Sequence, residues 1–324
     1  MAFSIALAGK GGTGKTSISA LLVQMLSKKG VVLAIDADPA TNLNQALGVE
    51  AGSTVGRIRE EMTRDILAGT LSPSISKPDY LEGQIRAALV ESKGFDLLAI
   101  GRPEGPGCYC AANNMLRMSI DKLGRNYRYV VIDSEAGMEH ISRQTTRDVD
   151  ILIIVSDPTQ RSIRTAAAIK GLIGEMRTRV GQIALVINRS PAGLPPEIAR
   201  AAESHGFDSP LTIGQDPNLA GLEIQGRPTT ELPTDSPLRL GVAELIGRLG
   251  QQGAARANIC CVAGEARLSG RIYLMNVSPV SNIQSFLETF RNSGAAPSSL
   301  TGRSATCHLA PSTLSVRSRP LVSS

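Results

Sequence analysis

The chain has 324 residues, enough for a large buried core and compatible with one α/β domain plus an extension. Residues 253–324 hold seven of the 34 Lys and Arg residues and two of the 29 Asp and Glu residues, so residues 1–252 carry 27 of each sign. This neutral balance argues against a nucleic-acid surface, and no apolar run of about 18 residues is present to cross a membrane. We therefore expect a cytoplasmic protein that binds neither nucleic acid nor a membrane.

The first motif is a glycine-rich loop between an apolar run at residues 3–7 and a helical pattern. It has the form G-x-x-x-x-G-K-[ST], in which glycines allow backbone N–H groups to surround phosphates. Lys15 would neutralise the β- and γ-phosphate oxygens, the Thr16 hydroxyl would bind Mg²⁺, and the helix N-terminus adds partial positive charge. The sequence thus predicts a nucleotide-binding loop made of Gly9, Lys10, Gly11, Gly12, Thr13, Gly14, Lys15, Thr16 and Ser17.

Lys10 follows the first glycine of this loop directly, at a position where a general phosphate loop requires no lysine. The form K-G-G-T-G-K-T resembles the deviant Walker A motif of the MinD/ParA superfamily, which includes nitrogenase iron protein. The resemblance implies that Lys10 reaches the nucleotide phosphates of a partner subunit. It also implies that ATP, bound with Mg²⁺, holds a homodimer together.

The next apolar run, residues 31–35, predicts a buried parallel strand that ends in Asp36-Ala37-Asp38-Pro39. This D-x-D-P resembles the first switch of the superfamily, where the second acid helps to position the attacking water. The resemblance makes Asp38 a catalytic residue beside Mg²⁺. The alternative is that Asp and Pro only terminate the strand.

Two cysteines, Cys108 and Cys110, lie in a loop that glycine and proline keep irregular. A soft metal ion prefers four thiolates, or two thiolates with other donors, so one chain supplies half of a site. A two-fold dimer would supply the other half. The alternatives are two buried or incidental cysteines, or a strained disulfide between them.

Residues 129–133 have the form of a Walker B strand, in which Asp133 would hold Mg²⁺ through water. By the same resemblance the following segment is the second switch, and Gly137 brings its N–H group to the γ-phosphate. His140 lies in this segment, where a solvent-facing loop histidine is favoured over a metal ligand. The cysteine loop and D-S-E-A-G-M-E-H together resemble the CooC-type nickel-insertion ATPases that mature carbon monoxide dehydrogenase. That resemblance implies Ni²⁺, with Zn²⁺ possible, between the cysteines of two subunits, and a nickel enzyme as client.

Apolar runs predict further strands at 95–100, 129–132, 151–155, 183–187 and 211–213. Helical patterns fall at 54–68, 82–92, 111–124, 161–178, 195–204 and 237–249. This alternation predicts an α/β fold for residues 1–252, a parallel sheet of the P-loop NTPase type with helices on both faces. Its ligands would lie at the carboxyl ends of the strands.

Two later segments resemble the adenine contacts of these ATPases: Asn188-Arg189 after one strand, and Asp216-Pro217 in a later loop. A guanine-specific N-K-x-D box is absent, which favours ATP. Residues 253–324 are rich in serine and lose periodicity, so we expect a disordered or weakly ordered tail with local pairing around 272–277.

These observations favour an ATP-hydrolysing nickel metallochaperone in which Lys10, Lys15, Asp38 and Asp133 are catalytic. One alternative is a positioning ATPase that binds membrane or DNA, although residues 238–249 carry only two bases, Arg239 and Arg248. Another is an iron–sulfur reductase like nitrogenase iron protein, whose cluster cysteines are far apart in sequence, whereas residues 1–252 contain only Cys108 and Cys110.

Overall fold

The computed structural model divides into two compact units, Met1–Leu245 and Ile246–Ser324. The structure describes residues 2–69, 76–101, 118–134, 148–175, 179–191, 193–260, 264–268, 271–276 and 315–318. Within these ranges, no helix has the length and apolar character needed to cross a membrane.

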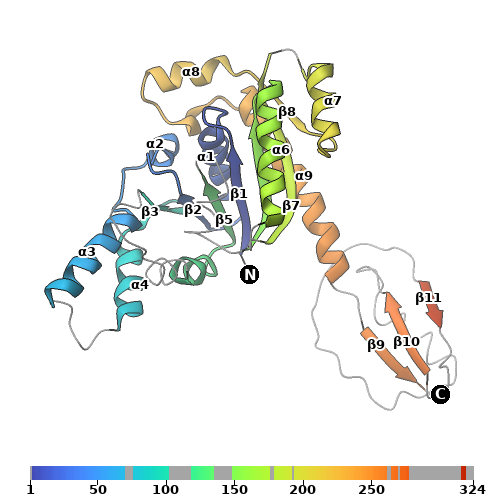
Figure 1. The fold of residues 1–324 in the computed structure, drawn as a ribbon, viewed down its shortest axis with the longest axis horizontal. Coiled ribbons are helices and arrows are strands. Elements are labelled where there is room, and N and C mark those ends of the chain that lie inside the picture. The colour runs from blue at the N-terminus through green and yellow to red at the C-terminus, as the bar shows by residue number, and fades with distance from the viewer. Residues whose placement is uncertain are drawn as a thin grey trace. The chain divides into compact units, whose positions relative to one another are not determined.

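The first unit is built on an eight-stranded sheet in which every neighbouring pair is parallel except β3 and β4 (Figure 1). The strands are β1 Phe3–Gly9, β2 Val32–Asp36, β3 Val90–Ser92, β4 Phe95–Ala99, β5 Tyr129–Asp133, β6 Asp148–Ser156, β7 Arg179–Ser190 and β8 Leu211–Gly214. Their order is β3-β4-β2-β5-β1-β6-β7-β8. All of β2 and the last six residues of β6 are buried, as expected for strands covered on both faces. The predicted parallel sheet is confirmed.

Helices cover both faces because the crossovers that follow β1 and β6 run toward opposite edges of the sheet. The helices are α1 Lys15–Leu26, α2 Leu43–Leu47, α3 Val55–Ala68, α4 Lys77–Ala87, α6 Gln160–Glu175, α7 Pro196–Ser204, α8 Pro217–Ile224, the 3₁₀ helix η2 Thr229–Glu231, α9 Pro237–Cys260 and a segment at 118–124. α1 leads toward β2 and α6 toward β7, so right-handed crossovers place them on opposite faces. α6 crosses the nearer face in Figure 1, and its Ile163 and Ile169 share a core cluster with Ala6 of β1.

The prediction of a helix over 82–92 is wrong at its end. α4 stops at Ala87, and β3 pairs antiparallel with β4. The reversal between them depends on Gly94, whose φ of 86° lies in the left-handed region that glycine favours. The Lys93-Gly94 turn therefore decides the structure here, against the helical spacing of the apolar residues.

The second unit contains a three-stranded antiparallel sheet in the order β11-β10-β9. Its strands are β9 Gly264–Leu268, β10 Arg271–Asn276 and β11 Ser315–Ser318. The expected local pairing around 272–277 is found on β10, while the sequence did not predict β11. The boundary at residue 252 and the low order of 253–324 stay predictions.

Candidate nucleotide-binding site

Three of the predicted motifs meet at the carboxyl ends of β1, β2 and β5. β5 lies between the other two strands, and Asp133 at its end stands opposite both Leu7 of β1 and Asp36 of β2. The glycine-rich loop follows β1, and the D-x-D-P segment begins at the last residue of β2. Sequence segments about 100 residues apart therefore form one site.

The glycine-rich loop has a backbone that only glycine adopts easily at several points. Gly9, Gly12 and Gly14 have φ values of 147°, 77° and 90°. A Cβ atom on Gly9 would lie 2.1 Å from the Val155 carbonyl oxygen, while at Gly11 and Gly12 no atom lies within 4 Å. The loop is thus packed against β6 on one side and open on the other, as a phosphate cradle requires.

Lys15 directs its charge onto this loop. Its side chain is buried, and its Nζ atom donates to the carbonyl oxygens of Gly9 at 3.0 Å and Lys10 at 3.2 Å. Gly14 is the N-cap of α1 and offers no side-chain cap, so N–H groups of the first turn remain available to an anion. The loop fits the phosphates of a nucleotide.

Asp133 is held from α1. It is 1% exposed, and its Oδ1 atom accepts a hydrogen bond from Ser19 Oγ at 3.0 Å. Burial raises the pKa of Asp133 to about 6, while the Thr16 and Ser19 hydroxyls and the Lys15 charge act to lower it. A carboxylate beside a hydroxyl offers the hard oxygen donors that Mg²⁺ prefers, so Thr16 and Asp133 fit this ion.

Asp36 organises the loop that carries Asp38. Its carboxylate is buried and accepts hydrogen bonds from the N–H groups of Asp38 at 3.1 Å and Leu43 at 2.9 Å. Burial, assisted by the nearby Asp133 charge, raises the pKa of Asp36 to about 7 against these hydrogen bonds. The Asp38 carboxylate accepts from the Ala40 N–H group at 2.8 Å. Both acids therefore fix the turn after β2.

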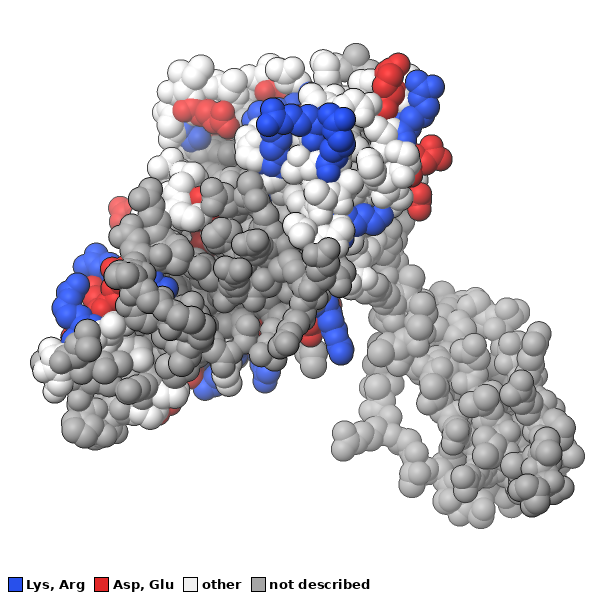
Figure 2. All heavy atoms as spheres, viewed as in Figure 1, with Lys and Arg blue, Asp and Glu red and all other residues white. Residues whose placement is uncertain are grey.

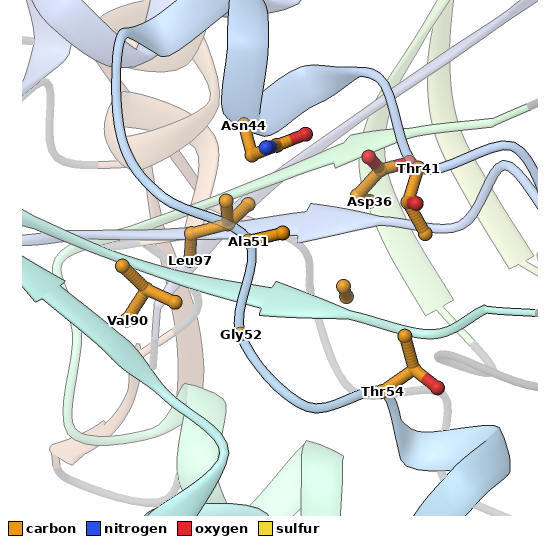
Figure 3. Close-up of a pocket in the computed structure, with 9 residues that line it drawn as sticks. Asp36, Thr41, Asn44, Ala51, Gly52, Thr54, Val90 and Leu97 are labelled. Atoms are coloured by element: carbon orange, nitrogen blue, oxygen red, sulfur yellow. The ribbon is translucent and has the colours of Figure 1, made fainter.

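A small pocket lies beneath this loop (Figure 3). Its polar lining comes from Asp36, Thr41, Asn44 and Thr54, and Figure 3 shows the Asn44 carboxamide directed toward the Asp36 side. The Asn44 Oδ1 atom is buried, and no described residue hydrogen bonds to it. The loop is therefore not packed tightly against β2 and β4 at this point.

Lys10 is paired within its own chain. Its Nζ atom lies 3.8 Å from Oδ2 of Asp157, which directly follows β6, and its side chain is 38% exposed. An exposed pair at this distance is weak, so an anionic ligand can compete for the lysine. The action of Lys10 on a partner's phosphates stays a prediction.

Asn188 and Arg189 contact the phosphate loop from the end of β7. Asn188 is 3% exposed, and its Nδ2 atom donates to the Thr13 carbonyl at 2.9 Å. Arg189 has a left-handed φ of 60° and donates from Nη1 to the Gly12 carbonyl at 2.9 Å. The structure thus places both residues beside the predicted site, while their contacts with adenine stay a prediction.

Asp216 connects the starts of two helices. Its Oδ1 atom accepts from the Asn218 N–H group at 2.9 Å in α8, and its Oδ2 atom accepts from Leu238 N–H at 3.3 Å in α9 and from the Ser236 hydroxyl. Pro217 is the first residue of α8. These hydrogen bonds hold the loop between the two helices, and its contact with the base stays a prediction.

Positive charge gathers at this edge of the sheet. Arg161 and Arg164 lie exposed on the first turns of α6, and Figure 2 shows Lys and Arg side chains clustered over this part of the molecule. Such a cluster beside the loop attracts anions such as nucleotide phosphates.

Four residues predicted from the sequence lie outside the described residues: Gly137, Cys108, Cys110 and His140. In the part of the chain that is described, no group of three or more His, Cys, Asp and Glu residues is arranged to hold a metal ion. The shared cysteine site therefore stays a prediction.

Comparison with known proteins agrees with this geometry. A family model, AAA_31, described as an AAA domain, matches residues 3–185. The chain belongs to the AAA_31 family. An uncharacterized ATP-binding protein of Methanocaldococcus jannaschii is 40% identical over 246 residues, 76% of this chain and 97% of that protein. The carbon monoxide dehydrogenase accessory protein CooC of Rhodospirillum rubrum is 37% identical over 188 residues, 53% of this chain and 69% of CooC.

The fold of this AAA_31 protein is that of the MinD/ParA P-loop proteins. The structure of MinD from Pyrococcus horikoshii, complexed with Mg-ADP, superposes with a TM-score of 0.54 at 22% identity. The match covers 77% of this chain and 98% of MinD. The predicted fold class is confirmed.

Three site residues of this AAA_31 protein had no role predicted from the sequence. Asp36 is the first acid of D-x-D-P, Ser19 is a hydroxyl in an otherwise apolar stretch of α1, and Asp157 is an acid that directly follows β6. An acid at the end of a buried strand was the available signal for Asp36 and Asp157. A polar residue on a buried helix face was the signal for Ser19.

The raised carboxyl pKa values predict a pH-dependent stability. Asp36 and Asp133 change from an ordinary pKa of 3.8 to about 7 and about 6 on folding, so the folded state binds more protons between these values. The stabilisation of the folded state by these two carboxyl groups is fully present below their ordinary pKa of 3.8. It is lost as the pH rises through their folded pKa values of about 6 and about 7. We expect the unfolding free energy without nucleotide to fall by about 2 kcal/mol between pH 6 and pH 8.

Urea unfolding of the nucleotide-free protein at several pH values measures this change. Asp36→Asn should remove most of the pH dependence, because it deletes the carboxyl with the higher pKa. The matched control is Asp208→Asn, which removes an exposed acid. Equal pH dependence in wild type and Asp36→Asn would contradict the assignment.

Proposed function

We propose that this protein binds ATP with Mg²⁺, hydrolyses it, and dimerises through the bound nucleotide. One observation carries the proposal: the open glycine loop, Lys15, Thr16 and Asp133 lie together at one edge of the sheet. The relative from Methanocaldococcus jannaschii is an ATP-binding protein, and MinD was solved with Mg-ADP, which supports this ligand.

Each residue has a task in the proposed reaction. Lys15 binds the β- and γ-phosphates, and its ammonium exchanges the hydrogen bonds to the Gly9 and Lys10 carbonyls for bonds to phosphate oxygens. Thr16 and Asp133 would hold Mg²⁺, which would neutralise phosphate charge. Asp38, on the turn fixed by Asp36, orients the attacking water, and Lys10 of the partner subunit stabilises charge on the transferred phosphate.

We further propose that nickel is the cargo of the dimer. Cys108 and Cys110 from two copies would supply four thiolates, a donor set that suits nickel and also zinc. The match over 188 residues to CooC, a carbon monoxide dehydrogenase accessory protein, supports carbon monoxide dehydrogenase as the client. ATP hydrolysis would then reset the dimer and release the ion. The MinD fold equally supports a positioning ATPase without a metal.

Metal content per dimer tests the cargo. Nickel and zinc would be measured by equilibrium dialysis and elemental analysis of the full chain, with and without a non-hydrolysable ATP analogue. We expect about one metal ion per dimer, lost in Cys108→Ser and Cys110→Ser because each variant removes two of four thiolates. Cys307→Ser is the matched control and should keep the metal.

The alternative function gives a different result in the same experiment. A dimer that forms with nucleotide but binds no metal in either state would favour the positioning ATPase. Nucleotide-dependent sedimentation with liposomes or DNA would then identify its surface.

A further inference from the structure

Ser19 is a buried hydroxyl that the phosphate-loop motif does not require. It lies one turn after Thr16 on α1, is 0% exposed, and is surrounded in sequence by the buried residues Ile18, Ala20 and Leu21. Burying a hydroxyl costs free energy unless it finds a partner. Its partner is Oδ1 of Asp133, 3.0 Å away across 114 residues of sequence.

Thr16 and Ser19 approach the same carboxylate. Residues three apart share one face of a helix, so both hydroxyls point from α1 toward the end of β5. The Thr16 hydroxyl also acts on the Asp133 carboxyl, whose pKa it lowers. A carboxylate held at one oxygen cannot rotate freely about its Cβ–Cγ bond. Ser19 therefore fixes Oδ1 and leaves Oδ2 for another ligand.

An alanine would satisfy a purely structural requirement at this position. Alanine has a higher helix propensity than serine and is the smaller, apolar side chain that this buried helix face accommodates. The serine instead supplies a donor to a buried acid whose position matches the Mg²⁺ site.

We propose that Ser19 is a positioning residue for Mg²⁺, because its hydroxyl sets the orientation in which the Asp133 carboxylate meets the ion beside Thr16. This inference rests on the proposed binding of ATP with Mg²⁺. It is independent of hydrolysis, dimerisation and nickel. Ser19 acts through Asp133 and does not contact the nucleotide itself.

The Mg²⁺ dependence of nucleotide binding tests this role without turnover. A fluorescent, non-hydrolysable ATP analogue would be titrated into the full chain in EDTA and at a series of Mg²⁺ concentrations. In Ser19→Ala we expect unchanged affinity in EDTA and a roughly tenfold higher Mg²⁺ concentration at half-maximal effect, the loss of one hydrogen bond to a charged group. The control Ser27→Ala removes a hydroxyl from the C-cap of α1, where it bonds the Gln24 carbonyl, and should match wild type.

A second variant covers the case in which Ser19→Ala does not fold. Ser19→Cys keeps the size of the side chain with a weaker donor, so its Mg²⁺ midpoint should rise severalfold. A wild-type midpoint in either folded variant, whatever its melting temperature, would overturn the role of Ser19. If the nucleotide affinity of the wild-type protein does not depend on Mg²⁺, that result would instead overturn the proposed function and this inference with it.

Discussion

Replacing Lys15 with alanine is expected to weaken ATP binding by about 100-fold or more, since charge-assisted hydrogen bonds to two phosphates are lost. The Lys15 ammonium donates hydrogen bonds to the Gly9 and Lys10 carbonyls of the loop. A phosphate that enters the loop would take over this ammonium. Titration with a fluorescent ATP analogue measures the effect.

Two comparisons separate lost binding from lost structure. Lys28→Ala removes an exposed lysine just after the same helix and should bind ATP as wild type does. Thermal unfolding of Lys15→Ala without ligand should stay close to wild type, because the alanine leaves α1 and its packing in place. Wild-type affinity in a folded Lys15→Ala protein would show that this loop is not the phosphate site.

Replacing Lys10 with alanine is expected to lower the ATP hydrolysis rate by about 100-fold or more while ATP binding changes little. A positive charge supplied by a partner to the transferred phosphate has effects of about 10³–10⁵ in related phosphoryl transfer, so the estimate is conservative. Steady-state hydrolysis and light scattering with an ATP analogue would measure the rate and the dimer. We expect hydrolysis and dimerisation to be lost together, because the proposed role of Lys10 is to contact the partner's nucleotide across the interface.

Asp157→Asn is the matched variant for this prediction. It removes the other half of the Lys10–Asp157 pair, which is 3.8 Å long in the single chain. Freed from this competitor, Lys10 should promote dimerisation at lower ATP concentration, with a modest effect because an exposed pair contributes at most about 1 kcal/mol. If Lys10→Ala keeps wild-type hydrolysis, the lysine has no role on a partner's nucleotide.

Several features of the site were predictable because they depend on a few consecutive residues. The loop from Gly9 to Thr16 needs glycine where φ is positive and a lysine and threonine at the helix start, and the structure has left-handed Gly12 and Gly14 there. The apolar runs of β2 and β6 are long enough to predict strands buried on both faces. The short hairpin at Gly94 was not predicted, because a single turn outweighed the local apolar spacing.

The parallel α/β fold and the phosphate loop could be predicted from the sequence, since both follow from short-range backbone preference and apolar periodicity. The position of β5 between β1 and β2, which places Asp133 beside Asp36 and within reach of Ser19, is known from the folded chain. The same is true of the contact between Asn188 and the loop carbonyl of Thr13. These contacts join residues more than 90 positions apart, and their partners are selected by strand order and burial, which no local pattern encodes.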